Sequence, residues 1–163
     1  MKRQMLPVLN PLALAFCLAL WACNPQHFYE KNYELPQKKW AVDSVLVFHL
    51  DIKEVQQAYN FYYNLRCSAD YPFQNLYVTF FLENEQGKVV AEELQNITLF
   101  EAKTGRPLGE GFGNLYSYQL PIPKLSGFRF PKPGKYTYRL VQYMRRDPLP
   151  EVVSVGLKVE KAP

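Results

Sequence analysis

The sequence predicts an all-β protein, because its composition and its hydrophobic pattern both favour strands over helices. The 163 residues include 12 Tyr and 11 Phe, which favour strands, and 13 Pro, which interrupt helices. Several segments alternate apolar and polar residues with a period of two, as half-buried strands do. We therefore expect a single antiparallel β-sandwich of two sheets, immunoglobulin-like or jelly-roll-like, over residues 43–163, after a signal peptide and a short tether.

The first 22 residues predict the signal peptide of a bacterial lipoprotein. The basic pair Lys2-Arg3 precedes an apolar run, 12–22, which has the length of a signal-peptide core but is too short to span a bilayer as a helix. The run ends in Leu20-Trp21-Ala22-Cys23, which fits a lipobox apart from the large Trp21. We expect cleavage before Cys23 and a lipid anchor on its thiol. The alternative is an ordinary signal peptide with an incidental cysteine, or an uncleaved anchor.

The mature chain would have few cysteines and little net charge. Cys17 would be removed with the signal peptide, so Cys67 would remain beside the lipidated Cys23, and an intrachain disulfide is not expected. Loss of the basic pair lowers the formal charge from +4 to +2, that is 4 − 2. This charge is too small to argue for a nucleic-acid partner.

The elements of the domain can be placed in order from the alternation. Residues 23–42 are polar and contain two prolines, which indicates a tether, although its aromatic residues suggest that the second half lies on the domain surface. Segment 76–83 is apolar on both faces and is therefore expected at the centre of a sheet. The glycine-rich stretch 109–113 indicates a flexible loop, and 115–123 an extended or irregular segment. The expected strands are 44–52, 56–65, 76–83, 88–90, 94–100, 135–144 and 152–160.

No constellation of residues predicts catalysis, a metal site or a cofactor. The two histidines, His27 and His49, are far apart and lack the spacing of metal ligands. Cys67 follows Arg66, which could lower the pKa of the thiol, but no plausible histidine base accompanies it. The stretch 109–113 superficially resembles a phosphate loop, yet it does not join a strand to a helix. We therefore expect neither enzyme activity nor a small-molecule substrate.

The connection 143–150 is the candidate partner-binding site. It joins the last two expected strands, so its tip should be exposed, and its two prolines lower the entropy lost on binding. Arginine and tyrosine dominate the hot spots of protein interfaces. The alternative is a solvated loop in which Asp147 pairs with an arginine. The candidate residues are Tyr143, Arg145, Arg146 and Leu149.

Tyrosines on the outward faces of strands offer a second candidate surface. Aromatic residues on strands usually belong to the core, but Tyr62, Tyr77 and Tyr118 are expected to face outward, where they could bind protein or glycan. This leaves an alternative function, a glycan- or peptidoglycan-binding β-sandwich module. Its sign would be two or three coplanar, exposed aromatic rings over a groove.

Several longer segments together resemble one known family. They are YNFYYN at 59–64, DYPFQNLYV at 70–78, TLF at 98–100 with TGRPLG at 104–109, FPKPGKY at 130–136, QYMRRDPLP at 142–150 and SVGL at 154–157. Over nearly all of the mature chain, their combination resembles the gliding motility lipoprotein GldH family of Bacteroidetes.

The resemblance implies an envelope lipoprotein that is needed for surface gliding and is functionally tied to type 9 secretion. It implies other envelope proteins as partners, and it supplies no catalytic residue. The residues that follow Cys23 are neither an acidic run nor an aspartate. We therefore expect the anchor in the outer membrane, with the domain facing the periplasm.

Overall fold

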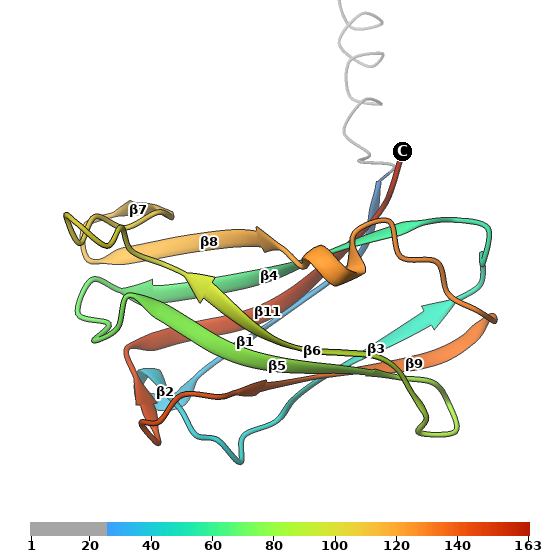
Figure 1. The fold of residues 1–163 in the computed structure, drawn as a ribbon, viewed down its shortest axis with the longest axis horizontal. Coiled ribbons are helices and arrows are strands. Elements are labelled where there is room, and N and C mark those ends of the chain that lie inside the picture. Colours follow the sequence, from blue (N-terminus) through green and yellow to red (C-terminus); the bar gives the residue numbers. More distant parts are fainter. Residues whose placement is uncertain (1–25) are drawn as a thin grey trace, which may run out of the picture.

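The computed structural model describes residues 26–163, which form two antiparallel sheets packed face to face (Figure 1). One sheet has five strands in the order β1-β11-β4-β8-β7, and the other has four in the order β3-β9-β5-β6. A short ladder pairs β10 with β2. The predicted all-β sandwich of two sheets is confirmed. Among the described residues, no helix is long and apolar enough to cross a membrane.

The bounds of the elements follow the alternation of the sequence closely. The five-stranded sheet consists of β1 His27–Glu34, β4 Tyr59–Ser68, β7 Glu110–Phe112, β8 Leu115–Pro121 and β11 Val152–Lys161. The four-stranded sheet consists of β3 Leu46–Ile52, β5 Asn75–Glu83, β6 Val89–Thr98 and β9 Gly134–Gln142. The remaining elements are β2 Lys39–Trp40, β10 Leu149–Pro150 and the 3-10 turns η2 Pro36–Lys38 and η3 Pro123–Leu125.

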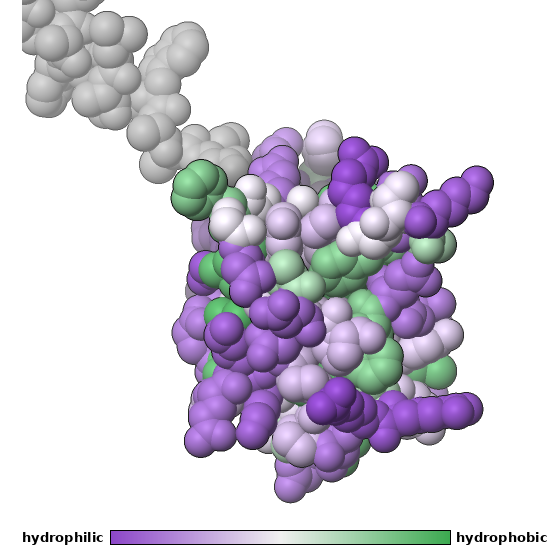
Figure 2. All heavy atoms as spheres, turned by 90° about the vertical axis from the view of Figure 1, so that its left-hand side faces the viewer, coloured by the Kyte–Doolittle hydropathy of each residue, from purple (hydrophilic) through white to green (hydrophobic). Residues whose placement is uncertain are grey.

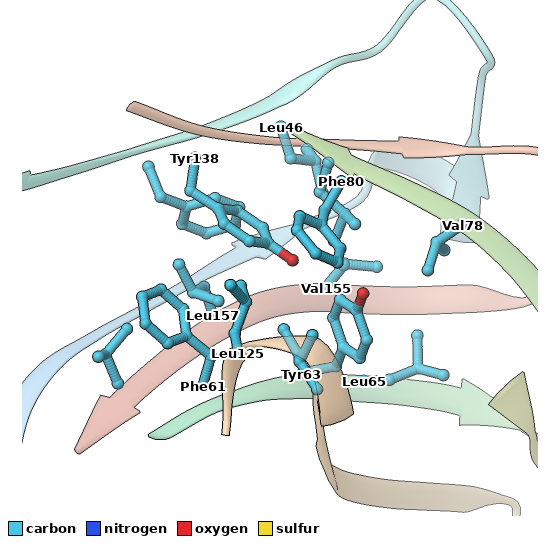
Figure 3. Close-up of a cluster of buried hydrophobic side chains, with 14 of the residues drawn as sticks. Leu46, Phe61, Tyr63, Leu65, Val78, Phe80, Leu125, Tyr138, Val155 and Leu157 are labelled. Carbon is cyan, nitrogen blue, oxygen red and sulfur yellow. The ribbon is translucent and has the colours of Figure 1, made fainter. Parts of the chain in front are cut away.

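The core lies between the sheets and is rich in aromatic rings (Figure 3). Every second residue of β3, β4 and β5 is buried, as the period of two predicts. Tyr138 of β9 stacks on Phe80 of the same sheet, with ring centroids 5.5 Å apart, and on Phe61 of the opposite sheet at 6.2 Å. These stacked rings join the two sheets at the centre of the core.

The expected tether differs from the structure over its described part, because residues 27–34 form the edge strand β1. This strand pairs with β11 along its length, for example Asn32 with Gly156. The Tyr33 hydroxyl donates to the Val47 carbonyl at 2.6 Å and so ties β1 to the other sheet. β1 reads as polar because an edge strand exposes much of its side-chain surface, which hides it from a hydrophobic pattern. The predicted signal peptide and Cys23 lie outside the described residues.

Two further segments also differ from expectation. The strands expected at 88–90 and 94–100 are one strand, β6, because its buried Ala91 continues the alternation across the gap. Residues 115–121 form the regular strand β8, whose Tyr118 faces inward and donates its hydroxyl to the Leu99 carbonyl at 3.1 Å. Tyr118 is therefore a core residue rather than an outward-facing one.

The sandwich has two distinct ends. The described chain begins beside the end of β11, since Lys161 donates its backbone N–H to the Gln26 carbonyl at 2.8 Å. We call this the proximal end. The opposite end, at the left of Figure 1, carries the connection from β1 to β3 and the connection from β9 to β11. We call this the distal end, and it holds the predicted partner-binding segment.

Candidate interaction surface at the distal end

The predicted segment 143–150 is fastened at its base to the chain that follows β1. Leu149 pairs with Trp40 in the β2–β10 ladder, and both side chains are fully buried. Beside this ladder, the Val42 N–H donates to the Asp147 carboxylate at 2.9 Å. The base of the loop is therefore fixed by packing and hydrogen bonding, while its tip is exposed.

Strained backbone gathers at the same corner. Gln37, Lys38 and Glu151 have φ values of 54°, 54° and 63°, and no other non-glycine residue of the described chain has a positive φ. The Glu151 carboxylate accepts a hydrogen bond from the Ser68 hydroxyl at 2.5 Å and pairs with Lys38 at 3.6 Å. Such conformations persist only where the surroundings hold them, and they concentrate at functional sites.

Three of the four predicted partner-binding residues lie on the surface. Tyr143 is 64% exposed, and Arg145 and Arg146 are exposed without an ion pair in the described part of the chain. Asp147 accepts from a backbone N–H, so the alternative in which it pairs with an arginine is not what the structure has. Leu149 is buried in the core and presents no surface to a partner.

The sequence did not reveal that Tyr143 continues an apolar area on the outer face of the four-stranded sheet. Its N–H donates to the Tyr77 carbonyl at 2.7 Å, and Tyr77 is itself partly exposed. In the next row, Val141, Thr79 and Leu94 lie side by side, and Leu94 is 50% exposed. Seen from the distal end, hydrophobic areas lie among hydrophilic ones (Figure 2).

We use the term distal patch for four residues whose exposed side chains lie at this corner. The apolar outer faces of the expected strands were the available signal, but the register that aligns them comes only from the fold. The distal patch consists of Tyr77, Tyr143, Arg145 and Arg146.

The described residues gather no reactive groups. Burial raises the pKa of the Cys67 thiol to about 11, although a hydrogen bond with Tyr118 acts in the opposite direction. This is the reverse of the lowered pKa that Arg66 could have caused. No group of three or more His, Cys, Asp or Glu side chains within residues 26–163 could hold a metal ion. His49 lies exposed on a strand, 3.5 Å from the Thr137 hydroxyl.

Comparison with known proteins gives full-length similarities. A family model described as GldH lipoprotein matches residues 27–159. The chain is 27% identical over 149 residues to a "Gliding motility lipoprotein GldH homolog" of Christiangramia forsetii, covering 86% of this chain and 88% of that protein. It is 24% identical over 157 residues to a "Gliding motility lipoprotein GldH" of Flavobacterium johnsoniae, covering 92% and 94%.

Likenesses to solved structures are weak. The K1 cleaved adhesin domain of Lys-gingipain from Porphyromonas gingivalis W83 aligns with a TM-score of 0.34 and 11% identity, over 86% of each chain. A chain of infectious bursal disease virus, Gx strain, aligns with a TM-score of 0.36 and 12% identity over 82% of this chain, which spans 30% of the viral one.

Proposed function

The chain belongs to the GldH lipoprotein family, and from this membership we propose that it is a non-enzymatic accessory or structural component of the gliding machinery, linked to type 9 secretion. In this proposal a lipid on Cys23 holds the protein in the outer membrane, with the domain in the periplasm. The protein acts by presenting a docking surface to another envelope protein.

The placement of the distal patch opposite the start of the domain carries this proposal. Cys23 precedes Gln26 by three residues, which span at most about 10 Å of extended chain. A lipid on Cys23 would therefore hold the proximal end close to the bilayer. β11 has 10 residues, a rise of about 33 Å, and its first residue lies at the distal end. The distal patch would thus point away from the membrane, toward partners in the periplasm.

The chemistry of the distal patch favours an acidic and aromatic dock on the partner. Arg145 and Arg146 have no carboxylate partner within the described chain, so their charges are available. Tyr143 adds a rigid ring with few torsions to fix on binding. Because Val42 and Trp40 hold the base of the loop, part of the ordering cost of binding is met before the partner arrives.

Reversal of the two arginine charges tests the proposal. We expect Arg145→Glu with Arg146→Glu to leave the melting temperature nearly unchanged, to abolish co-purification of envelope proteins with the lipoprotein, and to block gliding or type 9 secretion in a deletion strain. The matched control is Lys132→Glu with Lys135→Glu, two exposed lysines near the proximal end that form no ion pair in the described chain. If the arginine variant complements the deletion as fully as the control does, the distal patch is not the docking surface.

The anchor has its own test. We expect Cys23→Ala to leave an unlipidated and mislocalised precursor, because the thiol that would carry the diacylglyceryl group is missing. Metabolic labelling with an alkyne fatty acid measures this directly. Label that persists on the Cys23→Ala protein would end the lipoprotein assignment of this cysteine.

A further inference from the structure

We propose that the outer face of the five-stranded sheet is a binding groove for a neutral oligosaccharide. The groove has a volume of about 570 Å³, and β1, β4, β8 and β11 all contribute side chains or backbone to it. This volume lies within the range of ligand sites. The groove is separate from the distal patch, so the inference does not depend on the proposed docking function.

A single row of the sheet builds the floor of the groove. Asn32 of β1 pairs with Gly156 of β11, Gly156 with Asn64 of β4, and Asn64 with Gln119 of β8. Side chains in one such row lie on the same face. Three planar amides and one glycine therefore cross four neighbouring strands in a line.

Gly156 makes room for Asn32 within this row. A Cβ at this position would lie 1.8 Å from the Asn32 side-chain oxygen and 2.6 Å from the Lys31 carbonyl. The missing side chain lets Asn32 lie across β11 and reach Asn64. Glycine weakens the interior of a strand, and here it permits the close approach of the Asn32 side chain to the backbone of β11.

Hydrogen bonds hold the amides in place and leave some of their groups unused. The Asn64 side-chain nitrogen donates to Glu30 at 2.7 Å and to Asn32 at 3.1 Å, and its oxygen accepts from Gln119 at 3.2 Å. The second Glu30 oxygen and the Asn32 side-chain nitrogen have no partner among the described residues. These groups form a fixed set of donors and acceptors that point into the groove, as vicinal hydroxyls require.

The walls match the two-sided character of a sugar ring. Leu108 lines the groove beside β8 and is exposed, whereas the Leu120 side chain lies on the inner face of β8 with Tyr118. Glu30 and Asn32 line the β1 side. A pyranose ring has apolar C–H faces and polar hydroxyl edges, so it can contact Leu108 while its hydroxyls bond the amides. Hydrogen bonds from the amides thus take the place of the coplanar, exposed aromatic rings that the sequence suggested for a glycan-binding module.

The charges of the groove select a neutral ligand. Three carboxylates, of Glu30, Glu34 and Glu110, line it against one guanidinium, of Arg66. Arg66 and Glu34 partly offset each other at 3.9 Å. The excess of negative charge disfavours anionic chains such as polyuronates. Because no described carboxylates gather into a metal-holding group, a cation is not the indicated ligand.

Binding of defined sugars to the mature lipoprotein tests this inference. The protein is solubilised in a detergent without a sugar headgroup and screened against neutral hexasaccharides of glucose, mannose, galactose and N-acetylglucosamine, with oligogalacturonate as the anionic probe. Isothermal titration then measures affinity. We expect at least one neutral series to bind and oligogalacturonate not to bind. Loss of one fixed partner in Asn64→Ala should weaken binding about tenfold.

Control variants decide between a site and incidental contact. Gln119→Ala is a second groove variant, and it keeps the test valid if Asn64→Ala fails to fold. Asn96→Ala removes an exposed amide from the other sheet and should leave the affinity unchanged. Reversal of Arg145 and Arg146 should also leave it unchanged, which separates this site from the docking function. Absence of binding by every neutral probe, equal binding of oligogalacturonate, or unchanged affinity in both groove variants would overturn the inference.

Discussion

The outer faces of the two sheets differ in how their polar side chains are hydrogen-bonded. On the five-stranded sheet, polar groups bond across strands, and the network runs from Glu30 through Asn64 to Gln119 and on to Lys158 at 3.4 Å. On the four-stranded sheet, separate polar pairs such as Asn75 with Asn96 and Arg139 with Glu83 flank apolar side chains, and the Arg139 guanidinium lies 5.3 Å from the centre of the Phe81 ring. One face therefore joins its polar groups into a single network, and the other combines isolated polar pairs with apolar contact area.

This difference teaches that one domain can carry two kinds of recognition on a shared core. Directional groups suit a polyhydroxyl ligand, whereas exposed rings and unpaired arginines suit a protein partner. Both faces depend on the same inner layer, because the two sheets interdigitate through aromatic contacts such as that of Phe61 with Tyr138. Damage to the core should therefore affect both faces, whereas surface changes should affect only one.

The largest expected effect comes from truncation of the shared core. Phe80 belongs to the four-stranded sheet and Leu157 to the five-stranded sheet, and both are fully buried. Each change to Ala should lower the free energy of unfolding by about 2–5 kcal/mol, from lost burial and a residual cavity. Denaturant unfolding of the purified protein measures the loss. If one variant loses stability and the other does not, the two sheets do not share one cooperative core.

The second effect concerns an interior strand of each sheet, β11 in the five-stranded sheet and β5 in the four-stranded one. Gly156→Ala places a Cβ against Asn32 and the Lys31 carbonyl, so β1 must shift, at a cost of about 1–3 kcal/mol. Thr79→Val is the matched change at the centre of the other face, where Val141 and Leu94 are its neighbours. We expect this control to stay within about 0.5 kcal/mol of the wild type. Equal costs in the two variants would mean that Gly156 is not constrained by its row.

The period of two in the sequence was enough to predict the inner layer but not the outer faces. The inward residues of β3, β4 and β5 follow directly from alternation, and so does the sandwich. The row Asn32–Gly156–Asn64–Gln119 joins residues from four distant segments, and only the strand order and register place them together. Leu149 was misplaced because an apolar residue in a short loop gives no sign that Trp40 covers it.

A third effect is a pH dependence of the free energy of unfolding, which arises from a buried thiol on the five-stranded sheet. Burial raises the pKa of Cys67, on β4, to about 11 from the ordinary value of 9.0. The unfolded chain then loses this proton at lower pH than the folded chain does. The contribution of Cys67 is therefore fully present below pH 9 and is lost as pH rises from about 9 toward 11. Unfolding at pH 8, 9 and 10 should show a steeper decline for the wild type than for Cys67→Ala.

The comparison of slopes reports on this thiol and on the two phenols coupled to it. Burial raises the pKa of Tyr63 and Tyr138 in both proteins, so these phenols act equally on both slopes. The pKa values of Tyr71 and Tyr118 are raised by burial and further by Cys67, so their share of the decline is smaller in Cys67→Ala. The cavity that Cys67→Ala leaves lowers stability at every pH and does not alter the slope. Parallel declines over this range would show that the folded protein does not protect the thiol.

The smallest effect, and the sharpest contrast between the sheets, concerns two buried phenols that lie near each other in the core (Figure 3). The Tyr63 hydroxyl, on the five-stranded sheet, donates to the Gln95 side chain at 2.7 Å. The Tyr138 hydroxyl, on the four-stranded sheet, makes no hydrogen bond of good geometry among the described residues and interacts only loosely with the Tyr63 hydroxyl. Removing a well-paired hydroxyl leaves its buried partner without a hydrogen bond, whereas removing a poorly paired one relieves the cost of having buried that hydroxyl away from water. Tyr63→Phe should therefore lower the free energy of unfolding by about 1 kcal/mol, and Tyr138→Phe should leave it unchanged or raise it by up to about 1 kcal/mol.

Thermal and denaturant unfolding of the two variants, which differ from the wild type by one oxygen each, measure the contrast. A loss in Tyr138→Phe as large as that in Tyr63→Phe would show that the Tyr138 hydroxyl is paired in solution and that the two sheets are joined there by a hydrogen bond as well as by stacked rings.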